Sequence, residues 1–170
     1  TPGGDKDYSY FVKQTIDLDR LPVLENGIQC KQASSYDRKS RYDEATDKYI
    51  DWDANGDAGK YVRTDSQTGE GVMAEIDGPG CIWRIWSANP QGKIRFYFDG
   101  ATTPSYEFDF SKLFSGKLVG FPRPLVWQRR VVLGGDNPAA NCYVPIPFAK
   151  SCKVTADKPH GQYYHIGYST

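Results

Sequence analysis

Apolar and polar residues alternate in short segments along most of this chain, and turn residues separate the segments. The clearest case is the segment in which Tyr106, Phe108 and Phe110 alternate with Glu107 and Asp109. A period of two places one kind of side chain on each face of a β-strand. Similar patterns predict further strands at residues 28–33, 60–65, 71–77, 81–87, 93–99, 126–133, 141–146, 151–155 and 163–168.

The turns between these segments indicate an antiparallel arrangement. Residues 78–80 (Gly-Pro-Gly) and 99–100 (Asp-Gly) are typical turn sequences, because they supply the backbone freedom that tight reversals need. Many short strands joined by such turns predict an all-β fold, an antiparallel sandwich or barrel with few short helical turns. We expect residues 16–170 to form a single domain, which is an ordinary size for one.

Other segments depart from the strand pattern. Residues 1–15 are expected to form a disordered or extended lead-in. Residues 16–24 predict one helical turn, which Pro22 ends. Residues 39–48 are charged and predict a loop or a short helix, and residues 111–114 predict a further helical turn.

The strand predicted at residues 81–87 is apolar on both faces. If it is regular, Trp83 and Ile85 lie on one face, and Ile82, Arg84 and Trp86 on the other. Trp83 and Trp86 then point in opposite directions. We expect one of them in the core and the other in a groove or a subunit contact.

Composition excludes two classes of partner. Lysine plus arginine and aspartate plus glutamate both number 21, so the formal net charge is zero. A neutral chain without a basic block argues against a dedicated nucleic-acid binder. No apolar run approaches the about 20 residues of a membrane-spanning helix, so we predict no membrane span.

The four cysteines are Cys30, Cys81, Cys142 and Cys152, and none forms a C-x-x-C pair, which argues against a zinc site. Each lies in an apolar or strand-like run. We expect most of them to be buried free thiols that pack as small apolar groups. The alternative is one disulfide between Cys142 and Cys152, which a hairpin would bring together.

The sequence DWDANGD, which begins at Asp51, resembles the first half of a calcium loop. Position twelve of such a loop needs a glutamate and is Val62 here, and a strand follows, so the EF-hand class is excluded. A looser oxygen-ligated calcium site at Asp51, Asp53, Asn55 and Asp57 is one interpretation, and no other cofactor or metal is predicted.

Carbohydrate binding is a second interpretation of this loop. Asp51 and Asp53 would accept hydrogen bonds from sugar hydroxyls, and Trp52 would stack on a ring. Catalysis by these aspartates is disfavoured, because a general acid needs a pKa raised by burial and the loop is polar throughout. The third interpretation is a solvated acidic loop.

Further polar candidates follow the first predicted strand and occupy the last. Ser34, Ser35, Asp37 and Arg38 either wall a binding site or satisfy a turn through their own hydrogen bonds. His165 lies in the last predicted strand, where it is either a structural histidine or a partner for a sugar hydroxyl. His160 lies in a turn and is expected to be exposed.

Five segments occur in an order and spacing that resemble one family. They are residues 32–38 (QASSYDR), 55–61 (NGDAGKY), 75–86 (EIDGPGCIWRIW), 96–100 (FYFDG) with 113–116 (LFSG), and 142–153 (CYVPIPFAKSCK). Together they resemble glycoside hydrolase family 172, formerly domain of unknown function 2961, over about residues 18–168. The resemblance implies a jelly-roll β-sandwich, the first of two in the family's proteins.

The resemblance also implies an activity. It implies hydrolysis of furanosides of the arabinofuranosidase or difructose-anhydride type, by a retaining mechanism with two glutamates. In the family these glutamates lie downstream of the first jelly roll, so no residue here is assigned a catalytic role. It further implies trimer-based homo-oligomers and export from gut bacteria to the periplasm or beyond, and the strand at 163–168 suggests that a longer protein continues.

Two hypotheses follow for function. In the first, the chain is the N-terminal domain of a furanoside-acting hydrolase, which contributes substrate contacts but not the catalytic pair. The alternative is a non-catalytic carbohydrate-binding or oligomer-assembly module, since jelly rolls also serve as lectin and capsid domains. The residues assigned to substrate binding are Ser34, Ser35, Asp37, Arg38, Asp51, Trp52, Asp53, Trp86 and His165.

Overall fold

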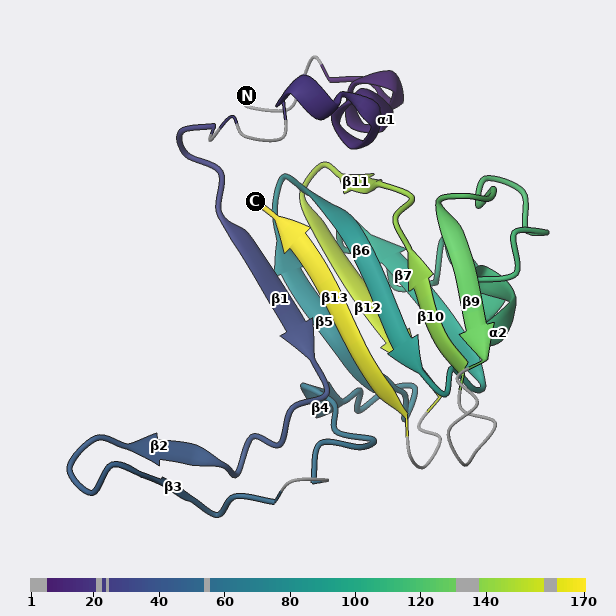
Figure 1. Ribbon diagram of the computed structural model, residues 1–170. Coiled ribbons are helices and arrows are strands. Elements are labelled where there is room, and N and C mark those ends of the chain that lie inside the picture. Colours follow the sequence, from purple (N-terminus) through teal and green to yellow (C-terminus); the bar gives the residue numbers. More distant parts are fainter. Residues whose placement is uncertain (1–5, 21–22, 24, 54–55, 131–137, 158–161) are drawn as a thin grey trace.

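Two antiparallel β-sheets pack face to face in the computed structural model, which describes residues 6–20, 23, 25–53, 56–130, 138–157 and 162–170 (Figure 1). The chain passes repeatedly from one sheet to the other between consecutive strands, as in a jelly roll. The predicted all-β sandwich is therefore confirmed. In the described part of the chain, no helix is long and apolar enough to cross a bilayer.

The first sheet has the strand order β1-β13-β6-β10-β9, with β11 paired to β6. These strands are β1 (Cys30–Ser34), β13 (Tyr163–Ser169), β6 (Gly80–Ala88), β10 (Pro138–Cys142), β9 (Val126–Arg130) and β11 (Ile146–Phe148). The second sheet has the order β4-β5-β12-β7-β8. Its strands are β4 (Arg63–Thr64), β5 (Gly71–Asp77), β12 (Ser151–Ala156), β7 (Lys93–Phe98) and β8 (Tyr106–Asp109).

The core lies between the two sheets. Many of the strands contribute the apolar side chains of one face, as the period of two predicts. Ile94 and Phe96 of β7 are fully buried, and so are Tyr164 and Ile166 of β13. The short helix α2 (Phe110–Leu113) closes the core at one edge with Phe110. The 3-10 turn at Leu18–Arg20 confirms the helical turn expected at residues 16–24.

Two segments differ from the sequence prediction. The expected disordered or extended lead-in contains helix α1 (Tyr8–Ile16), which begins because the Asp7 carboxylate accepts a hydrogen bond from the backbone N–H of Tyr10 at 3.1 Å. The predicted loop or helix at residues 39–48 is a hairpin of β2 (Arg41–Asp43) and β3 (Lys48–Ile50). Its turn places Asp47 at a positive φ of 53°, which aspartate tolerates. Figure 1 shows this hairpin projecting away from the sandwich.

A β-bulge in the pairing of β13 with β6 overturns the expectation for the two tryptophans. The register shifts opposite Trp83, so that Ile82 and Ile85 both point into the core. Trp83 instead donates its indole N–H to the Ser169 hydroxyl at 2.8 Å and contacts helix α1. Neither tryptophan belongs to the core, because one extra residue changes the face on which the following side chains lie.

The cysteines are free thiols. Cys81, Cys142 and Cys152 are buried, as expected, whereas Cys30 is exposed. Cys142 lies on β10 of the first sheet and Cys152 on β12 of the second, so the hairpin that would join them does not exist. Burial raises the pKa of the Cys142 thiol to about 12, which keeps it protonated and unreactive at neutral pH.

Paired charges cover the outer face of the second sheet. Arg95 contacts the carboxylates of Glu70, Glu107 and Asp157. Elsewhere on the same face, Lys93 pairs with Glu107, Arg63 with Glu75, and Lys153 with Asp65. This face is a closed network in which each of these cations has a carboxylate partner.

We expect Asp65 to make the fold sensitive to acid. The Lys153 ammonium, 3.0 Å away, and the backbone N–H groups of Gln67 and Thr68 lower the pKa of Asp65 from 3.8 to about 2. A lowered pKa stabilises the fold above pH 4 and loses that contribution as the pH falls towards 2. The Asp65→Asn variant should therefore show a shallower loss of stability between pH 4 and 2, measured by chemical denaturation. Asp77→Asn, an exposed position at the end of β5, should match the parent slope.

Candidate functional site

One row of side chains crosses the outer face of the first sheet. Its members, in strand order, are Ser34, His165, Trp86, Asn141 and Trp127. Each is the direct lateral partner of the next, and lateral partners share a face of the sheet. The five strands that carry them are adjacent in Figure 1. Two indole rings, an imidazole, an amide and a hydroxyl are thereby aligned on one surface.

The His165 imidazole lies against Trp86, with ring centroids 4.7 Å apart. Partial burial and the positive charge of Arg84 lower the pKa of His165 from 6.5, and Asp57 opposes this shift. The imidazole is therefore neutral at pH 7, so that one ring nitrogen donates and the other accepts. Such a group suits a ligand that carries hydroxyls.

Arg84 and Tyr143 fix the orientation of Asn141. The Arg84 Nε and Nη2 atoms both donate to Asn141 Oδ1, at 3.2 and 3.0 Å, and the Tyr143 hydroxyl donates to the same oxygen at 3.4 Å. Three donors on one atom identify it as the amide oxygen. These hydrogen bonds hold the Asn141 amide in one orientation between Trp86 and Trp127. Asn141 is also buried, since only 4% of the residue is exposed.

The segment that follows β1 forms a turn at the end of the sheet. Ser35 is buried, its N–H donates to the Tyr164 carbonyl, and its hydroxyl accepts from the Tyr164 N–H at 3.2 Å. Arg38 donates to the Ser34 carbonyl at 2.8 Å and stacks on the Tyr36 ring. Ser35 and Arg38 therefore shape the turn, which favours the local hydrogen-bond interpretation for these two residues.

Gly56 brings two acidic candidates together. A Cβ atom placed on Gly56 would lie 2.8 Å from Asp37 Oδ2 and 2.9 Å from the Cβ of Asp53. A side chain at this position would collide with both residues, so Gly56 packs directly against Asp37 in the turn after β1. The next residue, Asp57, is close enough to His165 to act on its pKa. An acidic rim of Asp37, Asp53 and Asp57 therefore borders the aromatic row.

No described contact joins Asp51 or Trp52 to the aromatic row or to the acidic rim. Trp52 is 66% exposed, and Asp51 adopts a positive φ of 55° at the exit of the hairpin. Their role in sugar binding stays a prediction. Among the described residues, no group of three or more histidine, cysteine, aspartate or glutamate side chains is arranged to hold a metal ion. Asn55, part of the calcium interpretation, and His160 lie outside the described residues.

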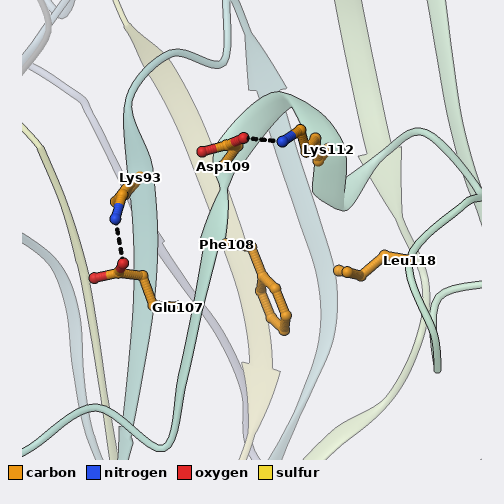
Figure 2. Close-up of a pocket in the computed structure, with 6 residues that line it drawn as sticks. All are labelled: Lys93, Glu107, Phe108, Asp109, Lys112 and Leu118. Carbon is orange, nitrogen blue, oxygen red and sulfur yellow. Dashed lines mark hydrogen bonds and ion pairs between the residues drawn. The ribbon is translucent and has the colours of Figure 1, made fainter.

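A cavity of about 260 Å³ lies elsewhere, at the edge of the second sheet. Figure 2 shows it between β7, β8 and α2, lined by Lys93, Glu107, Phe108, Asp109, Lys112 and Leu118. Its lysines are already paired, Lys93 with Glu107 and Lys112 with Asp109. None of the predicted site residues lines it. The outer face of the first sheet and its acidic rim are therefore the better candidate.

Comparison with protein families identifies the chain. The model of the first β-sandwich domain of glycoside hydrolase family 172 matches residues 26–170. The chain belongs to glycoside hydrolase family 172. Comparison with curated proteins gives no match. Membership of family 172 indicates carbohydrate as the ligand class, and aromatic rings beside carboxylates suit such a ligand.

Four residues of this site were missed by sequence reasoning. They are Arg84, Trp127, Asn141 and Tyr143. Each lies in a predicted strand, and although Arg84 and Tyr143 belong to the family segments, no residue type or spacing assigned any of the four to a site. These residues lie on one face because of the lateral order of the strands and the bulge in β6. Neither feature can be read from the sequence. The polar Asn141 within a buried apolar segment was the one available signal.

Proposed function

We propose that this family 172 sandwich is the N-terminal domain of a furanoside-acting hydrolase, of the arabinofuranosidase or difructose-anhydride type. The observation that carries the proposal is the junction at His165. There an aromatic row along the sheet meets an acidic rim beyond its end. A furanose ring presents an apolar C–H face and several hydroxyls, and this junction offers a complementary group for each.

Each part of the site has a distinct task in this proposal. Trp86 packs against the apolar face of a sugar ring. The Asp37 and Asp57 carboxylates accept hydrogen bonds from hydroxyls, and such charge-assisted bonds are about twice as strong as neutral ones. Neutral His165 donates one bond and accepts another. These contacts bind and orient the substrate without performing chemistry.

The chemical step belongs to a pair of carboxyl groups. Retaining hydrolysis needs two of them about 5–5.5 Å apart, one as nucleophile and one as acid and base. In this proposal they are two glutamates from the region that follows this sandwich in the family. We further propose a trimer-based assembly with active sites near subunit contacts, and export to the periplasm or the cell exterior.

A non-catalytic carbohydrate-binding or assembly module is the second candidate. One observation favours it: the aromatic row lies along a sheet face, whereas the cavity at the edge of the second sheet contains no site residue. Binding along an open face suits a polysaccharide chain. This candidate predicts binding without release of sugar.

The test is hydrolysis of arabinofuranosyl and fructofuranosyl substrates by the protein that carries this sandwich together with its following region. We expect sugar release, and Asp37→Asn should lower kcat/KM by about tenfold to 100-fold, because one charge-assisted contact is lost. Asp77→Asn, on the other sheet, is the matched control and should retain the parent value. Binding without release would support the carbohydrate-binding module instead, whereas neither binding nor release would refute both the hydrolase and the carbohydrate-binding module.

A further inference from the structure

Arg84, on the first sheet, differs from the cations of the second sheet in its partner. On the second sheet, Arg63, Arg95, Lys93 and Lys153 each contact a carboxylate. Among the residues that the structure describes, Arg84 forms no ion pair and donates side-chain hydrogen bonds only to the neutral amide of Asn141. A guanidinium keeps its charge at every physiological pH. The first sheet therefore presents a positive charge without a counter-ion.

The groups around Arg84 add donors and no negative charge. Asn141 Oδ1 already receives three donors, so the amide nitrogen is the part of that side chain left for a ligand. His165 is neutral at pH 7, because its pKa is lowered. The acidic residues gather beyond the end of the sheet, at the rim. The centre of the row is therefore rich in donors and suits a group that only accepts hydrogen bonds.

Space for such a group exists beside Arg84. Its lateral neighbour on β13 is Gly167, which has no side chain, and the next residue across the sheet is Gln32. A Cβ atom built on Gly167 would meet nothing closer than the Arg84 Cβ, at 3.8 Å. The lateral neighbour of Arg84 on β13 thus contributes no side chain that could cover it. Trp86 and Trp127 flank Asn141, so rings can stack next to the charge.

We infer that Arg84 and Asn141 form a carboxylate-binding site for a uronosyl residue of the substrate. This deepens the proposed function and rests on it, since the ligand is again a carbohydrate. The sugar ring stacks on the row of Trp86 and Trp127. Its carboxylate accepts hydrogen bonds from the free Arg84 N–H groups and from the Asn141 amide nitrogen. The acidic rim is then left for the neutral furanose.

The site is tested with sugars that differ only in charge. Titration calorimetry compares methyl glucuronide with methyl glucoside, and a uronosyl-bearing arabinofuranosyl oligosaccharide with its neutral counterpart. We expect the acidic sugars to bind about tenfold to 100-fold more tightly, as hydrogen bonds to charged groups allow. Equal affinity for acidic and neutral sugars overturns the inference. So does acetate that competes as well as methyl glucuronide, because the sugar ring would then contribute nothing.

Two variants locate the charge. Arg84→Gln should abolish the preference for acidic sugars, whereas Arg63→Gln, a cation paired with Glu75 on the other sheet, should preserve it. Asn141→Asp provides a second variant of almost unchanged shape, which gives Arg84 a carboxylate of its own and should also abolish the preference. A preference that survives in folded Asn141→Asp overturns the inference. If neutral furanosides are cleaved but no preference exists, the uronosyl site alone is wrong, whereas the absence of all sugar binding refutes the proposed function.

Discussion

Replacing Glu70 with alanine is expected to lower the free energy of unfolding by about 3 kcal/mol. The Glu70 side chain is only 14% exposed, accepts two hydrogen bonds and forms an ion pair with Arg95. The donors are the Tyr97 hydroxyl at 3.0 Å and the Thr155 hydroxyl at 2.5 Å, and Arg95 Nε lies 3.3 Å from the other carboxylate oxygen. Removing the carboxylate leaves the Tyr97 and Thr155 hydroxyls without this acceptor and Arg95 with one carboxylate fewer. Because these groups are largely shielded from water, each lost hydrogen bond costs free energy.

The measurement is urea or thermal unfolding of the Glu70→Ala variant. For a domain of this length, 3 kcal/mol corresponds to a fall in Tm of roughly 10 °C. Glu75→Ala is the matched control, since Glu75 pairs with Arg63 while both side chains are more than 40% exposed. Such an exposed pair contributes about 1 kcal/mol or less. Equal losses in the two variants would show that the Glu70 network contributes no more than a surface ion pair.

Replacing Trp86 with alanine is expected to weaken carbohydrate binding about 30-fold. Trp86 lies at the centre of the aromatic row, between His165 and Asn141, and its ring supports the imidazole at 4.7 Å. Its removal takes away the stacking surface and leaves His165 free to rotate. Because Trp86 is half-buried on the outer face and absent from the core, the fold should survive.

Affinity is measured by titration with an arabinofuranosyl oligosaccharide, after circular dichroism has established that the variant is folded. Trp52→Ala is the informative comparison, because this tryptophan is 66% exposed and lies at the end of the hairpin rather than on the sheet. We expect Trp52→Ala to change the affinity less than Trp86→Ala. A larger loss of affinity in Trp52→Ala than in Trp86→Ala would indicate that the sugar binds at the hairpin, and it would refute the proposed site on the sheet face.

Strands with a strong local signal were predicted closely. Residues 71–77 and 93–99 were expected to be strands and are observed as β5 (Gly71–Asp77) and β7 (Lys93–Phe98). Apolar residues alternate in the second of these segments and run consecutively in the first, and turn residues end both. The hairpin of β2 and β3 was missed, because its sequence is charged and neither face is packed against a core. Helix α1 was missed because the Asp7 cap follows an unpatterned lead-in.

The site was predicted in part. Asp37, Asp53, Trp86 and His165 were chosen by residue type, and the structure brings them to one end of the first sheet. Ser35 was also chosen, but it is buried and bonded to the backbone of Tyr164. Residue type indicates which chemistry a side chain can perform. Whether that side chain is free to perform it depends on the groups packed around it.

The sequence by itself determined the all-β class, most of the strands and the membership of family 172. These properties reside in alternation, turn residues and motif order, all of which are local along the chain. Only the tertiary structure decided which strands are neighbours, that a bulge at Trp83 changes the face of the residues after it, and that Arg84 lacks a carboxylate partner among the described residues. These depend on contacts between residues such as Arg84 and Asn141, 57 positions apart, for which a single sequence carries no local signal.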